Sequence, residues 1–148
     1  MSSSTWCARA PRTGYAHQVT PAAIAALVAV GLLAVIVVFQ IALALGAPLG
    51  AAAWGGRNPG VLPMRLRIAS GVAALVIYPL IILAVLASAG LIEAEWLPGN
   101  RTVLMWGLAG FLALGALANF ASRSPRERLW GPVALAIAIC FAIIAIGT

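Results

Sequence analysis

Ionisable side chains are scarce in this chain of 148 residues, and two of the common ones are absent. The sequence contains no lysine and no aspartate, and 8% of its residues are charged, compared with about a quarter in a soluble domain. Hydrophobic residues make up 64% of the chain, and its mean hydropathy is +1.08. This composition excludes an ordinary soluble domain.

Residues that commonly do chemistry are equally few. His17 is the sole histidine, so neither a histidine metal cluster nor a His–Asp catalytic arrangement can be built. Cys7 and Cys140 do not form a Cys-x-x-Cys pair, which disfavours thiol–disulfide chemistry. We therefore expect no catalytic residue, no metal and no cofactor, and we predict that the protein is not an enzyme.

Apolar residues, by contrast, fill four long stretches of the chain. A hydrocarbon core about 30 Å thick is crossed by a helix of about 20 apolar residues, and each stretch is of that order. The sequence thus predicts an all-α membrane protein, a bundle of four transmembrane helices, with residues 22–148 as one domain after a polar tail of residues 1–21. The stretches are residues 22–45, 66–86, 102–120 and 132–147.

The arginines indicate how the chain is oriented. Four spans place the first connection (46–65) and the third connection (121–131) on one side, and the second connection (87–101) with both termini on the other. Basic residues favour the cytoplasm, and exclusive use of arginine with much Ala, Gly and Val is typical of a GC-rich bacterium. We predict a multi-pass protein of a bacterial inner membrane with both termini outside. The first side has Arg57, Arg65, Arg67, Arg123, Arg126 and Arg128, and the second has Arg9, Arg12 and Arg101.

Five arginines flank helix ends that share one membrane face, and they form a candidate site for an anion or a lipid head group. Anionic phospholipid is attracted to short basic connections. The alternative is that these arginines only determine topology. The net charge of +6 would suggest nucleic acid in a soluble protein, but we expect no nucleic-acid partner for arginines placed between apolar spans. The five are Arg65, Arg67, Arg123, Arg126 and Arg128.

Two amide side chains are predicted near the same face. Gln40 lies about 8 Å inside the end of the first span at 1.5 Å per residue, and Asn119 lies at the end of the third. We expect an intramembrane polar contact, a hydrogen bond between the two helices. A binding cleft for a lipid head group or another anion is the alternative.

The connections contain several signals for local structure. In the first, Gly46 indicates a helix stop, the pair 55–56 (Gly-Gly) permits positive φ, and Asn58-Pro59-Gly60 predicts a turn. In the third, Ser124 and Glu127 have the spacing of a capping box around Pro125, which predicts a short helix.

Two further patterns concern the spans themselves. Tyr78-Pro79 predicts a kink in the second span, because proline removes a backbone donor. A ridge of small residues runs along the fourth span, which predicts close helix packing within the bundle or, alternatively, contact between copies in a homo-oligomer. The ridge consists of Gly131, Ala134, Ala138, Ala142 and Ala145.

Several of these motifs together resemble an uncharacterised family of small bacterial four-helix integral membrane proteins. The first half carries Gly-Ala-Pro-Leu-Gly from Gly46, Trp-Gly-Gly from Trp54 and Pro-Gly-Val-Leu-Pro from Pro59. The second half carries Asn119, Ser122 and Glu127-Arg128, followed by Trp130-Gly131-Pro132-Val133. The resemblance implies the four-span architecture and no catalytic residue.

Two classes of function fit this sequence. The first is a non-enzymatic, lipid-interacting or accessory membrane subunit, with membrane lipid or a larger membrane protein as its partner. The alternative is a small transporter or channel for a neutral or anionic solute. No span contains a carboxylate, which disfavours proton-coupled transport and leads us to prefer the first class.

Overall fold

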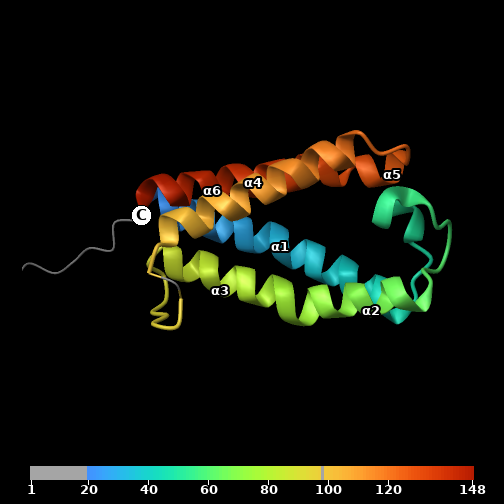
Figure 1. The fold of residues 1–148 in the computed structure, drawn as a ribbon, viewed down its shortest axis with the longest axis horizontal. Coiled ribbons are helices and arrows are strands. Elements are labelled where there is room, and N and C mark those ends of the chain that lie inside the picture. The colour runs from blue at the N-terminus through green and yellow to red at the C-terminus, as the bar shows by residue number, and fades with distance from the viewer. Residues whose placement is uncertain (1–19, 98) are drawn as a thin grey trace, which may run out of the picture.

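The computed structural model describes residues 20–97 and 99–148, which form helices and no strand (Figure 1). The predicted all-helical class is therefore confirmed. The predicted tail, with Cys7, Arg9, Arg12 and His17, falls almost entirely outside the described residues. The elements in order are α1 (Pro21–Leu45), η1 (Gly50–Ala52), η2 (Trp54–Gly56), α2 (Met64–Val72), η3 (Ala73–Ile77), α3 (Tyr78–Ser88), α4 (Arg101–Phe120), α5 (Pro125–Arg128) and α6 (Trp130–Gly147).

Four helical segments are long and apolar enough to cross a membrane, as expected for a multi-pass membrane protein. Much of their outer surface is apolar, and large side chains such as Val38, Leu75 and Phe111 are exposed on it. A surface of this kind fits contact with lipid rather than with water. The four segments are Pro21–Leu45, Met64–Ser88, Arg101–Phe120 and Pro125–Gly147.

The ends of α1 follow the signals in the sequence. The Thr20 hydroxyl accepts a hydrogen bond of 3.1 Å from the amide of Ala23, and Pro21 occupies the first turn, where its missing donor is harmless. At the other end Gly46 has φ 94°, the left-handed conformation that ends a helix. The predicted stop at Gly46 is confirmed.

The second long segment is irregular just before its proline. Residues Ala73–Ile77 form a π-helical turn, in which the amide of Tyr78 donates to the carbonyl oxygen of Ala73. Pro79 follows in the first turn of α3. Because Pro79 has no amide hydrogen, the helix departs from regular α-helical hydrogen bonding near it. The π-helical turn lies just before Tyr78-Pro79, where the sequence predicts a kink.

The four long segments lie side by side, but they do not pack evenly (Figure 1). The α6 helix packs closely against both α4 and α1, while α2 and α3 pack mainly against α1. The main core lies toward the end where α1 begins and α6 ends, and its fully buried members include Leu33, Val85, Met105 and Phe141. A smaller cluster of Leu43, Ala53 and Leu62 lies toward the other end.

The ridge of small residues on α6 faces the interior of the bundle. All its members are buried except Ala142, which is half-buried. A Cβ atom on Gly131 would lie 2.7 Å from the ring of Phe120, so a larger residue at this contact between α6 and the end of α4 would have to displace that ring. The predicted packing role within the bundle is confirmed.

Candidate functional site

The first and third connections fold against each other at the end of the bundle where α1 ends and α2 begins. The turns η1 and η2 contact α5 directly. The Ser124 hydroxyl donates to the carbonyl oxygen of Ala51, and a Cβ on Gly56 would lie only 2.3 Å from the Cβ of Ser124. This approach is possible because Gly56 has no side chain and adopts φ 65°.

Glu127 joins the two connections from the inside. Its side chain is 7% exposed, and its Oε1 accepts a hydrogen bond of 2.7 Å from the amide of Gly55. The Ser122 hydroxyl donates to its other oxygen, Oε2. A buried carboxylate is stable only when hydrogen bonds replace its water, and this pair of bonds does so.

The predicted short helix is confirmed as α5, with Ser124 as its N-cap and Pro125 in its first turn. The predicted capping-box hydrogen bonds are wrong. Ser124 makes no side-chain bond to the helix amides, and Glu127 does not return to the cap. Both side chains instead reach the first connection, because the docked backbone of 51–56 offers partners in a buried setting.

The first connection has an unusual backbone at the point of docking. Trp54, Gly55 and Gly56 have φ of 55°, 81° and 65°, so three successive residues are left-handed. Within the described part of the chain, Trp54 is the only residue other than glycine with a positive φ. The left-handed conformation is energetically costly for a bulky side chain. Its ring Nε1 donates to the hydroxyl of buried Ser70 at 3.2 Å, which holds the ring over α2.

Four of the five arginines in the predicted anion site are exposed, and all belong to elements that meet at this end of the bundle (Figure 1). Arg67 is half-buried and donates from Nε to the carbonyl oxygen of Ala44 at 3.0 Å, where it helps to terminate α1. Arg128 donates from Nε to the carbonyl oxygen of Ser122 at 2.8 Å. No hydrogen bond is formed by the side chains of Arg65, Arg123 and Arg126 within the described residues.

Two adjoining cavities lie at the same end of the bundle. The outer one has a volume of about 730 Å³ and a largely polar lining that includes Arg57 and Arg123. The inner one, of about 290 Å³, lies between α1, α3 and α4 and is lined mainly by aromatic and aliphatic side chains. Asn119 and Glu127 line both, so the cavities adjoin at these two residues.

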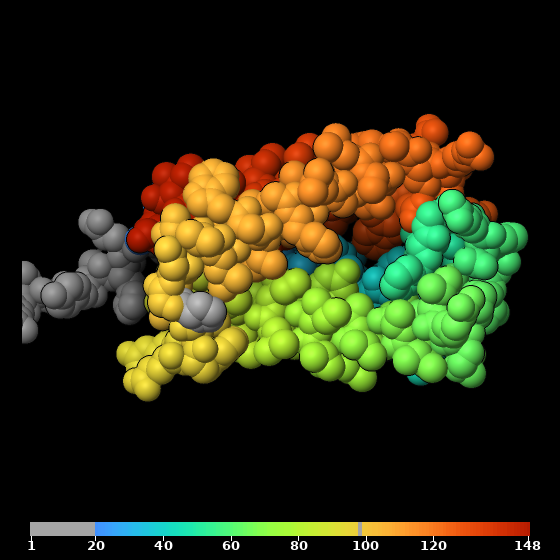
Figure 2. All heavy atoms as spheres, in the orientation of Figure 1, coloured from blue at the N-terminus to red at the C-terminus, as the bar shows by residue number. Residues whose placement is uncertain are grey.

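The inner cavity opens sideways between helices. Figure 2 shows a hollow between α4 and the η3–α3 segment, with α1 visible at its floor. The hollow exists because α4 packs against α6 and makes only light contact with α3. We call this opening the lateral groove. Its lining includes Ile36, Phe39, Gln40, Trp54, Tyr78, Phe111, Leu112, Gly115 and Trp130.

Gln40 and Asn119 both line the lateral groove, but among the described residues no hydrogen bond joins them. The Oε1 atom of Gln40 is buried and has no hydrogen-bond partner. Most buried polar atoms in proteins are paired, so this one marks a place where a bound molecule could donate a hydrogen bond.

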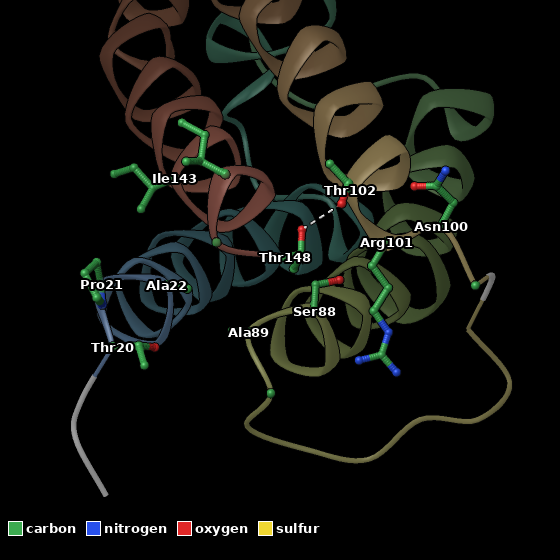
Figure 3. A pocket seen from close by; sticks show the side chains of 14 residues that line it. Thr20, Pro21, Ala22, Ser88, Ala89, Asn100, Arg101, Thr102, Ile143 and Thr148 are labelled. Carbon is green, nitrogen blue, oxygen red and sulfur yellow. Dashed lines mark hydrogen bonds between the residues drawn. The ribbon is translucent and has the colours of Figure 1, made fainter.

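A third cavity, of about 930 Å³, lies at the opposite end of the bundle (Figure 3). The hydroxyls of Thr102 and Thr148 lie 3.1 Å apart across it, and Arg101 donates to the carbonyl oxygen of Ala87 at 2.9 Å. The buried core between the two ends separates it from the lateral groove, for Leu33, Met105 and Phe141 are wholly buried there.

Within residues 20–97 and 99–148, no group of three His, Cys, Asp or Glu side chains is placed to hold a metal ion. Sequence reasoning missed Arg57 as a site residue, and it missed the role of Glu127. One indication of their roles was present in the sequence: both residues lie in connections that the four-span topology places on the same membrane face. Comparison with protein-family models, with curated proteins and with solved structures found no match to this chain.

Proposed function

We propose that this chain is a non-enzymatic integral protein of a bacterial cytoplasmic membrane, and that it interacts with anionic lipid through its arginine-rich end. It acts alone or as an accessory subunit of a larger membrane assembly. The observation that carries the proposal is the excess of exposed positive charge at this end of the molecule. Its one acid, Glu127, is buried and bonded to Gly55 and Ser122, while Arg65, Arg123 and Arg126 are exposed.

The orientation that we propose puts the arginine-rich end in the cytoplasm and the termini outside. It is supported by the number of arginines on each side of the membrane. Six lie at the end formed by the first and third connections, whereas the opposite side has three, Arg101 and the two arginines of the tail. The cytoplasmic leaflet is also where anionic lipids give a negative surface potential, and each arginine near it contributes about 1 kcal/mol. The same residues thus favour both the orientation and the lipid contact.

Native mass spectrometry of the purified protein tests the proposal. We expect the wild-type protein to retain phosphatidylglycerol or cardiolipin, and the triple variant Arg123→Gln, Arg126→Gln, Arg128→Gln to release it. Arg101→Gln, at the opposite end, is the control and should retain lipid. Equal retention in the triple variant would leave the arginines as determinants of topology only.

A small transporter or channel is less well supported. Such a protein needs a polar path through the bilayer, or two states that expose a site to each side in turn. The described residues form cavities at both ends, but the buried core of Leu33, Met105 and Phe141 lies between them and offers no polar group.

A further inference from the structure

We propose that the lateral groove and the outer cavity together bind one molecule of an anionic phospholipid of the phosphatidylglycerol class. One acyl chain lies in the groove between α1, α3 and α4, and the phosphate lies in the outer cavity beside Arg57 and Arg123. The inference rests on the proposed function and adds to it a specific site with a definite stoichiometry.

The shape of the site suits an amphiphile. The groove is open toward the side of the bundle that lipid would occupy, and apolar residues of three helices line it, among them Ile36, Phe111 and Leu112. The polar outer cavity adjoins it at Asn119 and Glu127. A lipid can therefore place its acyl chain among apolar side chains and its head group among polar ones.

The charges of the outer cavity suit a phosphate. Arg57 and Arg123 line it and are exposed, so their guanidinium groups are free to form bidentate hydrogen bonds to phosphate oxygens. Glu127 also lines it, but both of its oxygens accept hydrogen bonds from Gly55 and Ser122. Two arginines against one carboxylate leave the cavity with a net positive charge.

Gln40 suits the region between phosphate and chain. It is predicted to lie about 8 Å below the end of α1, and its Oε1 lacks a donor. The glycerol head group of phosphatidylglycerol carries hydroxyls that can supply one, whereas phosphatidylcholine has no hydrogen-bond donor. The site should therefore distinguish these two lipids by charge and by hydrogen bonding.

Photo-crosslinking tests the proposal directly. The full-length protein is reconstituted in phosphatidylcholine nanodiscs that contain a trace of phosphatidylglycerol with a diazirine on one acyl chain. After irradiation, mass spectrometry identifies the labelled residues. We expect labels on the groove lining, including Gln40 and Trp54, and much weaker labelling by a diazirine phosphatidylcholine of the same chain length. Labels spread over the outer helix faces, or equal labelling by both lipids, would overturn the site.

A groove-filling variant provides the matched comparison. Gly115 lines the groove, and a Cβ built on it meets no atom within 4 Å, so Gly115→Leu starts its side chain without a clash and adds bulk to the groove. Gly110 is on the same helix with the same free space, but it is not among the residues that line the groove. We expect Gly115→Leu to reduce specific labelling at least about tenfold, which corresponds to about 1.4 kcal/mol, and Gly110→Leu to leave it unchanged.

The outcomes separate this inference from the proposed function. If Gly115→Leu labels like the wild type while the Arg123, Arg126, Arg128 triple variant still loses lipid in native mass spectrometry, the groove does not bind lipid and the arginine-rich end does. If the triple variant also keeps its lipid, both proposals fail. Gln40→Leu, which adds no bulk at α4, should lower labelling by phosphatidylglycerol as well, and unchanged labelling would remove Gln40 from the site.

Discussion

Glu127 shows how a single side chain can determine the arrangement of two distant loops. It lies in a four-residue helix, yet its bonds go to Gly55 and Ser122 rather than to its own helix. Hydrogen bonds to a charged group contribute about 1.5 to 3 kcal/mol each, more than a neutral bond. The docking of the first connection therefore depends strongly on this carboxylate.

Replacing Glu127 with alanine should destabilise the protein by about 2 kcal/mol or more, because the amide of Gly55 and the hydroxyl of Ser122 lose a charged acceptor. Glu127→Gln keeps one oxygen and should cost less. Unfolding in mixed detergent micelles measures both. Glu95→Ala is the control, since that glutamate is exposed. Equal stability of all three variants would show that the buried bonds contribute nothing.

At the scale of elements, the contact between the two connections depends on the absence of a side chain at Gly56. Gly56→Ala introduces strain at φ 65° and a Cβ 2.3 Å from that of Ser124, whereas Gly60→Ala introduces strain at φ 95° in open space. The strain alone costs about 1 to 2 kcal/mol.

We therefore expect Gly56→Ala to undock the first connection and Gly60→Ala to leave it in place. Trypsin cleavage after the exposed Arg57 reports on this, because an undocked loop fits a protease better. Cleavage at equal rates in the two variants would mean that the close approach to Ser124 is not needed for docking.

The amides of α1 and α4 share a cavity without sharing a hydrogen bond. A double-mutant cycle with Gln40→Leu and Asn119→Leu should thus give a coupling free energy below about 0.6 kcal/mol, the average for polar pairs between membrane helices. Unfolding of the four proteins in mixed micelles supplies the cycle. A larger coupling would show that the two side chains do bond in the bilayer.

The helices and their ends could be read from the sequence, because hydrophobic length, Gly46 and Pro125 each act locally. The partners of Glu127 could not. Its spacing from Ser124 matches a local cap, but Gly55, 72 residues away, offers a buried amide that competes for the carboxylate. The lateral groove could not be predicted from the sequence either. It exists because α4 packs against α6 rather than against α3, and the apolar surfaces of the four segments are too similar to indicate that preference.

At the scale of the whole molecule, cysteine labelling tests the proposed orientation. In a variant with Cys7 and Cys140 replaced by alanine, we expect Arg126→Cys to be shielded from an impermeant maleimide in intact cells and Glu95→Cys to react. Both positions are exposed and belong to opposite ends of the bundle, and neither side chain forms a hydrogen bond within residues 20–97 and 99–148. A permeant maleimide should label both. The reverse pattern would place the arginine-rich end outside.

The bond between Gly55 and Glu127 also bears on the order of events during biosynthesis. Gly55 leaves the ribosome 72 residues before the carboxylate that accepts its amide hydrogen. The residues of α1, α2 and α3 are thus synthesised before this partner, which lies in the connection between α4 and α6. The two connections therefore cannot close before residue 127 has been synthesised, and a chain truncated before it lacks the carboxylate that accepts the Gly55 amide.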